Sequence, residues 1–168
     1  MMLEIALEAD EEWDSRGSWD ALVRSAAEAA IAESAFPQLA TSERPVELSV
    51  RLAGDQEVRE LNGKWRGQDK ATNVLSFPLV DAAELQNTNV SDRELLLGDI
   101  VLARGVCESE ADEKGVSIEQ HAAHLVVHGT LHLLGYDHQH DDAAAEMEAR
   151  EVRALARLGI ADPYAGGA

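Results

Sequence analysis

Apolar residues spaced two apart predict strands along the chain. Leu3, Ile5 and Leu7 mark one strand over residues 3 to 8, and the segment PVELSVRLA places four apolar side chains on one face of a second. Two further strands are predicted over residues 72 to 77 and 97 to 103. The long polar segment between these last two is expected to form a loop.

Apolar residues three and four apart, bounded by capping residues, predict helices in the rest of the chain. Ser117 and Gln120 have the spacing of a capping box, in which each side chain bonds the backbone of the other. The predicted helices run from Ser18 to about Ser34, from Asp55 to Gly63, from 103 to 114 before Gly115, from Ser117 to near Gly135, and from Asp141 or Asp142 to Gly159. Strands and helices mix without strict alternation, which indicates an α+β fold.

The composition is that of one globular domain over residues 1 to 168. The chain has 168 residues, of which 45% are apolar, and it contains no run of 18 apolar residues that would span a membrane. Its first residues lack the basic segment of a secretion signal. Its single cysteine excludes an internal disulfide framework and fits a reducing cytoplasm. We therefore expect a cytoplasmic protein.

The charge is strongly acidic. Fourteen Lys and Arg residues stand against 32 Asp and Glu residues, for a net charge of −18. Such a surface repels polyanions over a long range, which argues against a nucleic-acid partner. A local basic patch can still overcome this repulsion, so the objection stays open.

All six histidines lie between residues 121 and 140. His128 and His132 are four apart, so a helix places both on one face, where two imidazoles can share a metal ion. His138 follows the helix-breaking Gly135, and a turn there can return it as a third ligand. Three imidazoles around Zn²⁺ leave one position for water, which is the pattern of a catalytic site. Residues 122 to 134 are otherwise apolar, and coordination of a metal gives buried imidazoles a reason to be there.

The remaining polar residues nearby allow more than one interpretation. His124 lies one turn before His128. It is expected to be a side chain that contacts a metal ligand, a proton carrier or a residue that lines the site. His121 and His140 are expected to be solvated. Asp137 either orients an imidazole N–H or forms the turn.

Gly129 argues against a peptidase. Zinc peptidases with the pattern H-E-x-x-H carry their general base at this position, whereas this chain reads H-G-T-L-H. Glycine inside a helix costs about 1 kcal/mol relative to alanine, so another group is expected to approach closely here.

A basic segment interrupts the acidity. Lys64, Arg66 and Lys70 lie within seven residues, with Trp65 among them. Arg66 can clamp a phosphate and Trp65 can stack on a base, although such a segment is more often an ordinary exposed loop.

Three segments in order resemble the YbeY family of bacterial rRNA-maturation endoribonucleases: WRGQDKATNVLSFP at 65 to 78, LGDIVL at 97 to 102 and HGTLHLLGYDH at 128 to 138. The ending ADPY is also similar, so the resemblance runs from about residue 46 to 164. It implies a small mixed sheet of about four strands with packed helices. It also implies zinc ligands at His128, His132 and His138, an essential arginine at Arg66, and a zinc site on a central helix and the turn after it.

The activity that the resemblance implies is metal-dependent cleavage of single-stranded RNA, used in 3′-end maturation of small-subunit ribosomal RNA and in ribosome quality control. The implied cofactor is one Zn²⁺ per chain. The implied partners are single-stranded RNA and the small ribosomal subunit with its proteins, and neither a membrane nor DNA is expected. Two positions depart from the family pattern: Trp65 stands where tyrosine is common, and Asn73 where many members have aspartate.

Zinc would polarise a phosphoryl oxygen or supply hydroxide, and Arg66 would stabilise the charge that develops in the transition state. Zinc hydroxide and His124 are the candidate bases, and Ser76 is either a hydrogen-bonding group at the cleft or a strand serine without a role. Two alternatives remain. One is a metallohydrolase of another substrate class, and the other is a non-catalytic ribosome-assembly factor that a metal stabilises.

Overall fold

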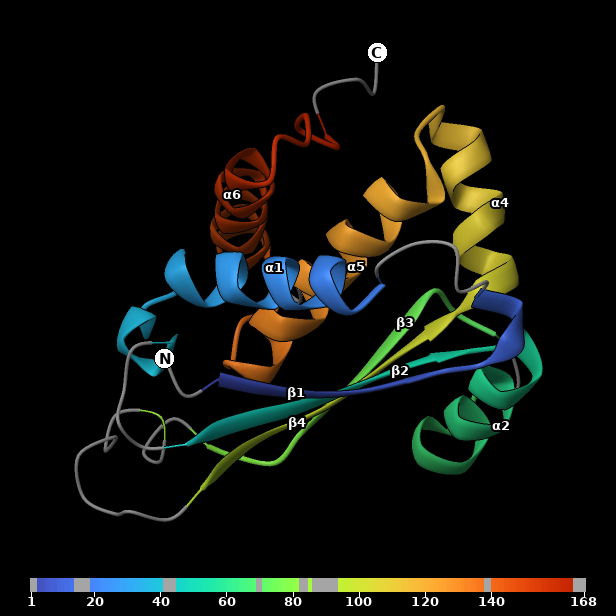
Figure 1. Ribbon diagram of the computed structural model, residues 1–168, viewed down its shortest axis with the longest axis horizontal. Coiled ribbons are helices and arrows are strands. Elements are labelled where there is room, and N and C mark those ends of the chain that lie inside the picture. The colour runs from blue at the N-terminus through green and yellow to red at the C-terminus, as the bar shows by residue number, and fades with distance from the viewer. Residues whose placement is uncertain are drawn as a thin grey trace.

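The computed structural model describes residues 3–13, 19–40, 45–68, 71–81, 85, 94–137 and 140–164. Helices and strands follow one another along this part of the chain without regular alternation, as Figure 1 shows. The elements are β1 (Leu3–Ala9), η1 (Glu11–Trp13), α1 (Trp19–Ala32), η2 (Pro37–Ala40), β2 (Val46–Ala53), α2 (Asp55–Arg66), β3 (Val74–Pro78), β4 (Leu95–Ala103), α4 (Arg104–Lys114), α5 (Ile118–Leu133) and α6 (Asp141–Arg157).

The four strands form one mixed sheet in the order β1-β2-β4-β3. β1, β2 and β4 are parallel, and β3 pairs antiparallel with β4 at the edge. The α+β class and the number of strands predicted from the sequence are confirmed. Within the described part of the chain, no helix is both long enough and apolar enough to cross a bilayer.

Alternate residues of the strands face two separate cores. Ile100 and Leu102 of β4 belong to the main core, which the sheet forms with α1, α5 and α6. Val101 and Leu75 point the other way and pack with Val58 of α2 in a smaller core. α2 and α5 therefore cover opposite faces of the sheet, as their places in Figure 1 also show.

α5 lies at the centre of the fold. The predicted capping box is present: the Gln120 backbone N–H donates to Ser117 Oγ at 3.1 Å, and the Ser117 N–H donates to the Gln120 side chain at 3.3 Å. Its apolar residues are buried on nearly every side, as predicted. The close approach expected at Gly129 is confirmed, because a Cβ built there would lie 3.0 Å from Ile100 Cγ2 and 3.1 Å from Ser76 Oγ.

Two predicted helix boundaries are wrong. Gly63 does not end α2, which continues to Arg66 and ends at Gly67, whose φ of 67° lies in the left-handed region that glycine favours. The N-cap of α6 is His140, one residue before the predicted aspartates, and its side chain makes no capping hydrogen bond. Ser18, the predicted cap of the first helix, lies outside the described residues.

Candidate functional site

One turn of α5 brings His128 and His132 together, as their spacing predicted. The two rings are 4.6 Å apart at their centroids, and their Nε2 atoms are 3.1 Å apart. Two nitrogens that bind one tetrahedral zinc at 2.0–2.1 Å lie about 3.3 Å from each other. The donor set and its spacing therefore fit a zinc ion.

The third predicted ligand, His138, lies outside the described residues. The chain leaves α5 as expected: Gly135 has a φ of 97°, which ends the helix and begins a turn. Asp137 is exposed at the end of this described segment, and both of its suggested roles stay open.

Glu151 of α6 is the polar group behind these histidines. It is 1% exposed, and its two carboxylate oxygens lie 2.9 Å from His128 Nδ1 and 2.8 Å from His124 Nε2. Burial alone would raise the pKa of Glu151, but the hydrogen bonds with His124 and His128 outweigh it and lower the pKa to about 2. Glu151 therefore places a buried negative charge beside the imidazoles of His124 and His128.

The sequence reasoning missed Glu151 and the Tyr164 hydroxyl that donates to it at 2.5 Å. A signal for Glu151 was present, since it shares the buried stripe of α6 with Met147 and Leu155. A charged residue in such a stripe needs buried partners. No local pattern indicates that Tyr164 returns to the same carboxylate.

His121 is buried, so the prediction that it is solvated is wrong. It is 2% exposed, and its Nε2 lies 2.8 Å from Glu110 Oε1. Burial lowers the pKa of His121, although the hydrogen bond with Glu110 acts to raise it. Asn73 Nδ2 donates to the same oxygen at 3.0 Å. An aspartate at this position would place a second carboxylate there. His140 is exposed, as expected.

The basic segment lies at the end of α2. Trp65 is 63% exposed, with its ring centroid 6.4 Å from that of Phe77, and Lys64 Nζ lies 5.3 Å from the Trp65 ring. Arg66 is exposed beside them, and Lys70 lies outside the described residues. A cavity of about 610 Å³ opens on this face, lined in part by Leu61, Trp65, Phe77 and Leu79.

The structure does not bring the helices of Arg66 and the histidines together. α2 packs on one face of the sheet and α5 on the other. Edge strand β3 lies between them: Phe77 faces Trp65, whereas the Oγ of Ser76 lies beside Gly129. A single ligand that contacts both sides by way of this edge would pass Ser76 and Phe77.

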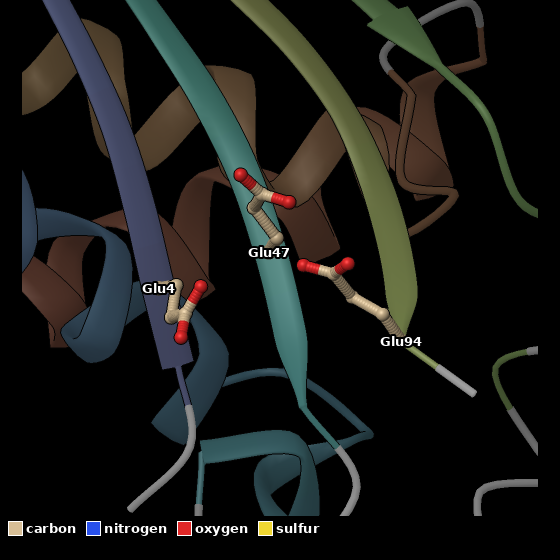
Figure 2. Close-up of side chains that lie close together, drawn as sticks. All are labelled: Glu4, Glu47 and Glu94. Atoms are coloured by element: carbon tan, nitrogen blue, oxygen red, sulfur yellow. The ribbon is translucent and has the colours of Figure 1, made fainter. Parts of the chain in front are cut away.

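A cluster of acidic residues lies apart from the histidines. Glu4, Glu47 and Glu94 each place a carboxylate oxygen within 4.8 Å of the others. Figure 2 shows these side chains on β1, on β2 and directly before β4. A hydrogen bond with Glu94, burial and the nearby negative charges raise the pKa of Glu47. Acidic clusters at a surface are common without a metal, and this one identifies no site.

The chain is similar to known proteins along most of its length. Residues 7–159 match the family described as Endoribonuclease YbeY. A protein of that name from Sphingopyxis alaskensis is 54% identical over 165 residues, which are 98% of each chain. A protein of the same name from Rhizorhabdus wittichii is 50% identical over the same shares.

A solved structure shares the fold. The solution structure of a protein from Thermotoga maritima superposes with a TM-score of 0.55 at 23% identity, and it covers 93% of this chain and 92% of its own. The match over residues 7–159 and the identity to these relatives show that the chain belongs to the YbeY family.

Proposed function

We propose that this chain is a zinc-dependent endoribonuclease specific for single-stranded RNA. The observation that supports it most is the pair of Nε2 atoms of His128 and His132, 3.1 Å apart on a buried helix. The name of its relatives, Endoribonuclease YbeY, supplies the substrate class and the reaction. The biological role proposed with it is 3′-end maturation of small-subunit ribosomal RNA and ribosome quality control, by a single cytoplasmic domain.

His128, His132 and His138 are the proposed ligands of one zinc ion per chain. When bound, zinc supplies a Lewis acid for a phosphoryl oxygen or a hydroxide at neutral pH. The apolar residues of α5 around the pair exclude water from one side of the site. Arg66 is the proposed group that neutralises charge on the phosphate, for RNA that passes the edge at β3.

The acidity of the chain limits how it binds RNA. At a net charge of −18, the segment around Lys64, Arg66 and Lys70 is the main local exception to the acidity, so binding to RNA alone is expected to be weak. Many ribosomal proteins are basic, and the acidic surface suits docking on the small subunit. This docking is part of the proposal.

The packing around Gly129, as well as the sequence, argues against a peptidase. A Cβ at residue 129 would lie 3.0–3.2 Å from side-chain atoms of Ile100 and Ser76, so a peptidase base there would require these side chains or the helix to shift.

The test is metal analysis of the purified protein together with cleavage of single-stranded RNA and of casein, each with and without a chelator. We expect about one zinc per chain and chelator-sensitive cleavage of RNA only. The variants His128→Ala, His132→Ala and His138→Ala should each lose most of the zinc, because two remaining imidazoles hold zinc poorly. His140→Ala is the matched control, since His140 is exposed, and it should keep both zinc and activity.

Arg66→Ala separates catalysis from a role of the metal in stability alone. It should keep zinc and the melting temperature of the parent, and lose RNA cleavage at least about tenfold, as expected for a group that stabilises transition-state charge. Unchanged cleavage would remove Arg66 from the mechanism. Zinc-loaded protein that processes no RNA would instead support the non-catalytic assembly factor.

A further inference from the structure

We propose that Glu151 and Tyr164 are positioning residues, which hold His128 in the tautomer that presents Nε2 to a metal. The inference rests on the proposed function for the identity of the ligand, but its geometry lies entirely in side chains that the structure describes. Glu151 belongs to none of the segments quoted for the resemblance, and Tyr164 ends the segment ADPY, to which the sequence assigned no role.

Glu151 lies between two histidines of α5 that are one turn apart. One carboxylate oxygen, Oε2, is 2.9 Å from His128 Nδ1, and the other, Oε1, is 2.8 Å from His124 Nε2. A carboxylate only accepts hydrogen bonds, so each of these ring nitrogens carries its proton toward Glu151. A neutral His128 protonated at Nδ1 has its lone pair at Nε2, the atom that faces His132.

Tyr164 fixes the orientation of the carboxylate. Its hydroxyl donates to Glu151 Oε1 at 2.5 Å, so this oxygen accepts from both Tyr164 and His124. The Tyr164 ring packs edge-on against His124, with centroids 5.6 Å apart and an interplanar angle of 89°. The backbone N–H of Tyr164 donates to Asp162 Oδ1 at 2.8 Å, which holds the turn after α6. With Oε1 held twice, Oε2 stays directed at His128.

The same arrangement narrows the role of His124. Its Nε2 is engaged by Glu151, and its Nδ1 is buried with no hydrogen-bond partner among the described residues. A proton on Nδ1 would leave a buried donor without a hydrogen bond, which costs its full desolvation free energy. His124 therefore helps to hold Glu151 through Nε2, and this nitrogen is not free to bind a metal.

The first test measures tautomers without any metal. The ¹⁵N shifts of the histidine rings in the metal-free protein at neutral pH should show a proton on Nδ1 of His128 and on Nε2 of His124. In Glu151→Gln the amide offers one acceptor oxygen in place of two, so His128 should populate both tautomers. A parent protein in which His128 carries its proton on Nε2 would overturn the proposal.

The second test measures zinc affinity by competition with a chelator. Glu151→Gln should weaken binding about 10- to 100-fold, the usual effect of removing the partner of a ligating histidine. Tyr164→Phe, which lacks only the hydroxyl of a partly exposed ring, should weaken it by a smaller factor of about 3 to 10. Glu148→Gln is the matched control, because it removes the same charge from an exposed position of α6, and it should bind zinc as the parent does.

The outcomes separate this inference from the proposed function. If Glu151→Gln and Tyr164→Phe bind zinc as tightly as Glu148→Gln, the positioning role is wrong. If Glu151→Gln does not fold, Tyr164→Phe alone decides. If tautomers and affinities follow the expectation but the parent cleaves no RNA, the proposed function fails and the positioning role stands.

Discussion

Gly129 and Gly63 are both helical glycines, but their surroundings differ. At Gly63 a Cβ would meet only Gln68 O, at an ordinary 3.8 Å, whereas at Gly129 it would press on Ile100 and Ser76 at 3.0–3.2 Å. Gly63→Ala is therefore expected to raise the free energy of unfolding by about 0.5–1 kcal/mol, the usual gain of alanine over glycine in a helix. Gly129→Val should lower it by about 1–3 kcal/mol through overpacking.

Urea denaturation of Gly63→Ala, Gly129→Ala and Gly129→Val beside the parent gives these differences. Gly63→Ala serves as the control for helix propensity, so a smaller gain for Gly129→Ala reports the contact of residue 129 with the sheet. Equal gains for Gly63→Ala and Gly129→Ala, with no loss for Gly129→Val, would show that α5 moves away from β4 freely.

At the scale of residues, the sequence predicted what depends on neighbours along one helix. The pairing of His128 with His132 follows from their spacing of four, and the close approach at Gly129 follows from the cost of glycine. The surroundings of His121 and Glu151 could not be predicted, because they depend on partners from other helices. His121 contacts Glu110 of α4, and Glu151 contacts His124 and His128 of α5. The ligand role of the histidines stays a prediction.

At the scale of elements, Glu33 joins the end of α1 to α6. Its carboxylate lies 2.6 Å from Arg157 Nε and 3.1 Å from Arg153 Nε. The hydrogen bond from Arg157 and then that from Arg153 lower the pKa of Glu33, against the opposing effect of burial. An acid whose pKa is lowered by folding stabilises the fold above its unfolded pKa, and this contribution is lost as the pH falls through the lower folded value.

Glu33→Gln should therefore reduce the free energy of unfolding at neutral pH by about 0.4–2 kcal/mol, the range for two exposed ion pairs. The difference from the parent should shrink once the pH falls below the usual carboxyl value of 4.5. Denaturant titrations over a series of pH values measure it. A difference that is the same at every pH would mean that the ion pairs contribute nothing.

Glu47 should show the opposite sign for the same substitution. Its folded pKa is raised, first by the hydrogen bond with Glu94, so its ionisation disfavours the fold above the unfolded pKa. Glu4 is its register partner on β1. Glu47→Gln should raise the free energy of unfolding at neutral pH by about 0.2–1 kcal/mol, the range for cross-strand pairs, and this gain should vanish below the usual carboxyl pKa. A loss at neutral pH would contradict the repulsion.

The strands and helices themselves were largely predictable, because their periodicities are local. The helix boundaries at Gly63 and His140 were not predicted correctly. At Gly63 the helix continues to Trp65, which packs on Phe77, and the local sequence does not indicate this contact. Local sequence patterns could not predict the order of the strands in the sheet either. β4 lies between β2 and β3, a placement that depends on which buried faces meet.

At the scale of the whole molecule, the sheet separates two sets of groups that the sequence analysis joined. His128 and His132 lie with α5 on one face, and Arg66 ends α2 on the other. The edge at β3 is the short route between them. If RNA reaches both sets, as proposed, it is expected to pass the side chains on the two faces of this strand, Ser76 and Phe77.

The net charge of −18 makes RNA binding depend on few contacts. If Lys64, Arg66 and Lys70 are the residues that neutralise phosphates, the logarithm of the affinity for a single-stranded oligonucleotide should fall against the logarithm of salt concentration with a slope of about −2, from about −0.7 for each contact. Arg66→Ala should reduce this slope by about 0.7, because one phosphate contact is lost.

Lys114→Ala is the matched control, because it removes the same charge from an exposed position at the end of α4. At 0.1 M salt and above it should leave both the affinity and the slope close to those of the parent, since the field of a charge farther than about 10 Å away is largely screened there. Equal changes of slope in the two variants would mean that RNA responds only to the total charge. A slope near zero in the parent would mean that phosphates contact no basic side chain, and the proposed path past β3 to Arg66 would then be wrong.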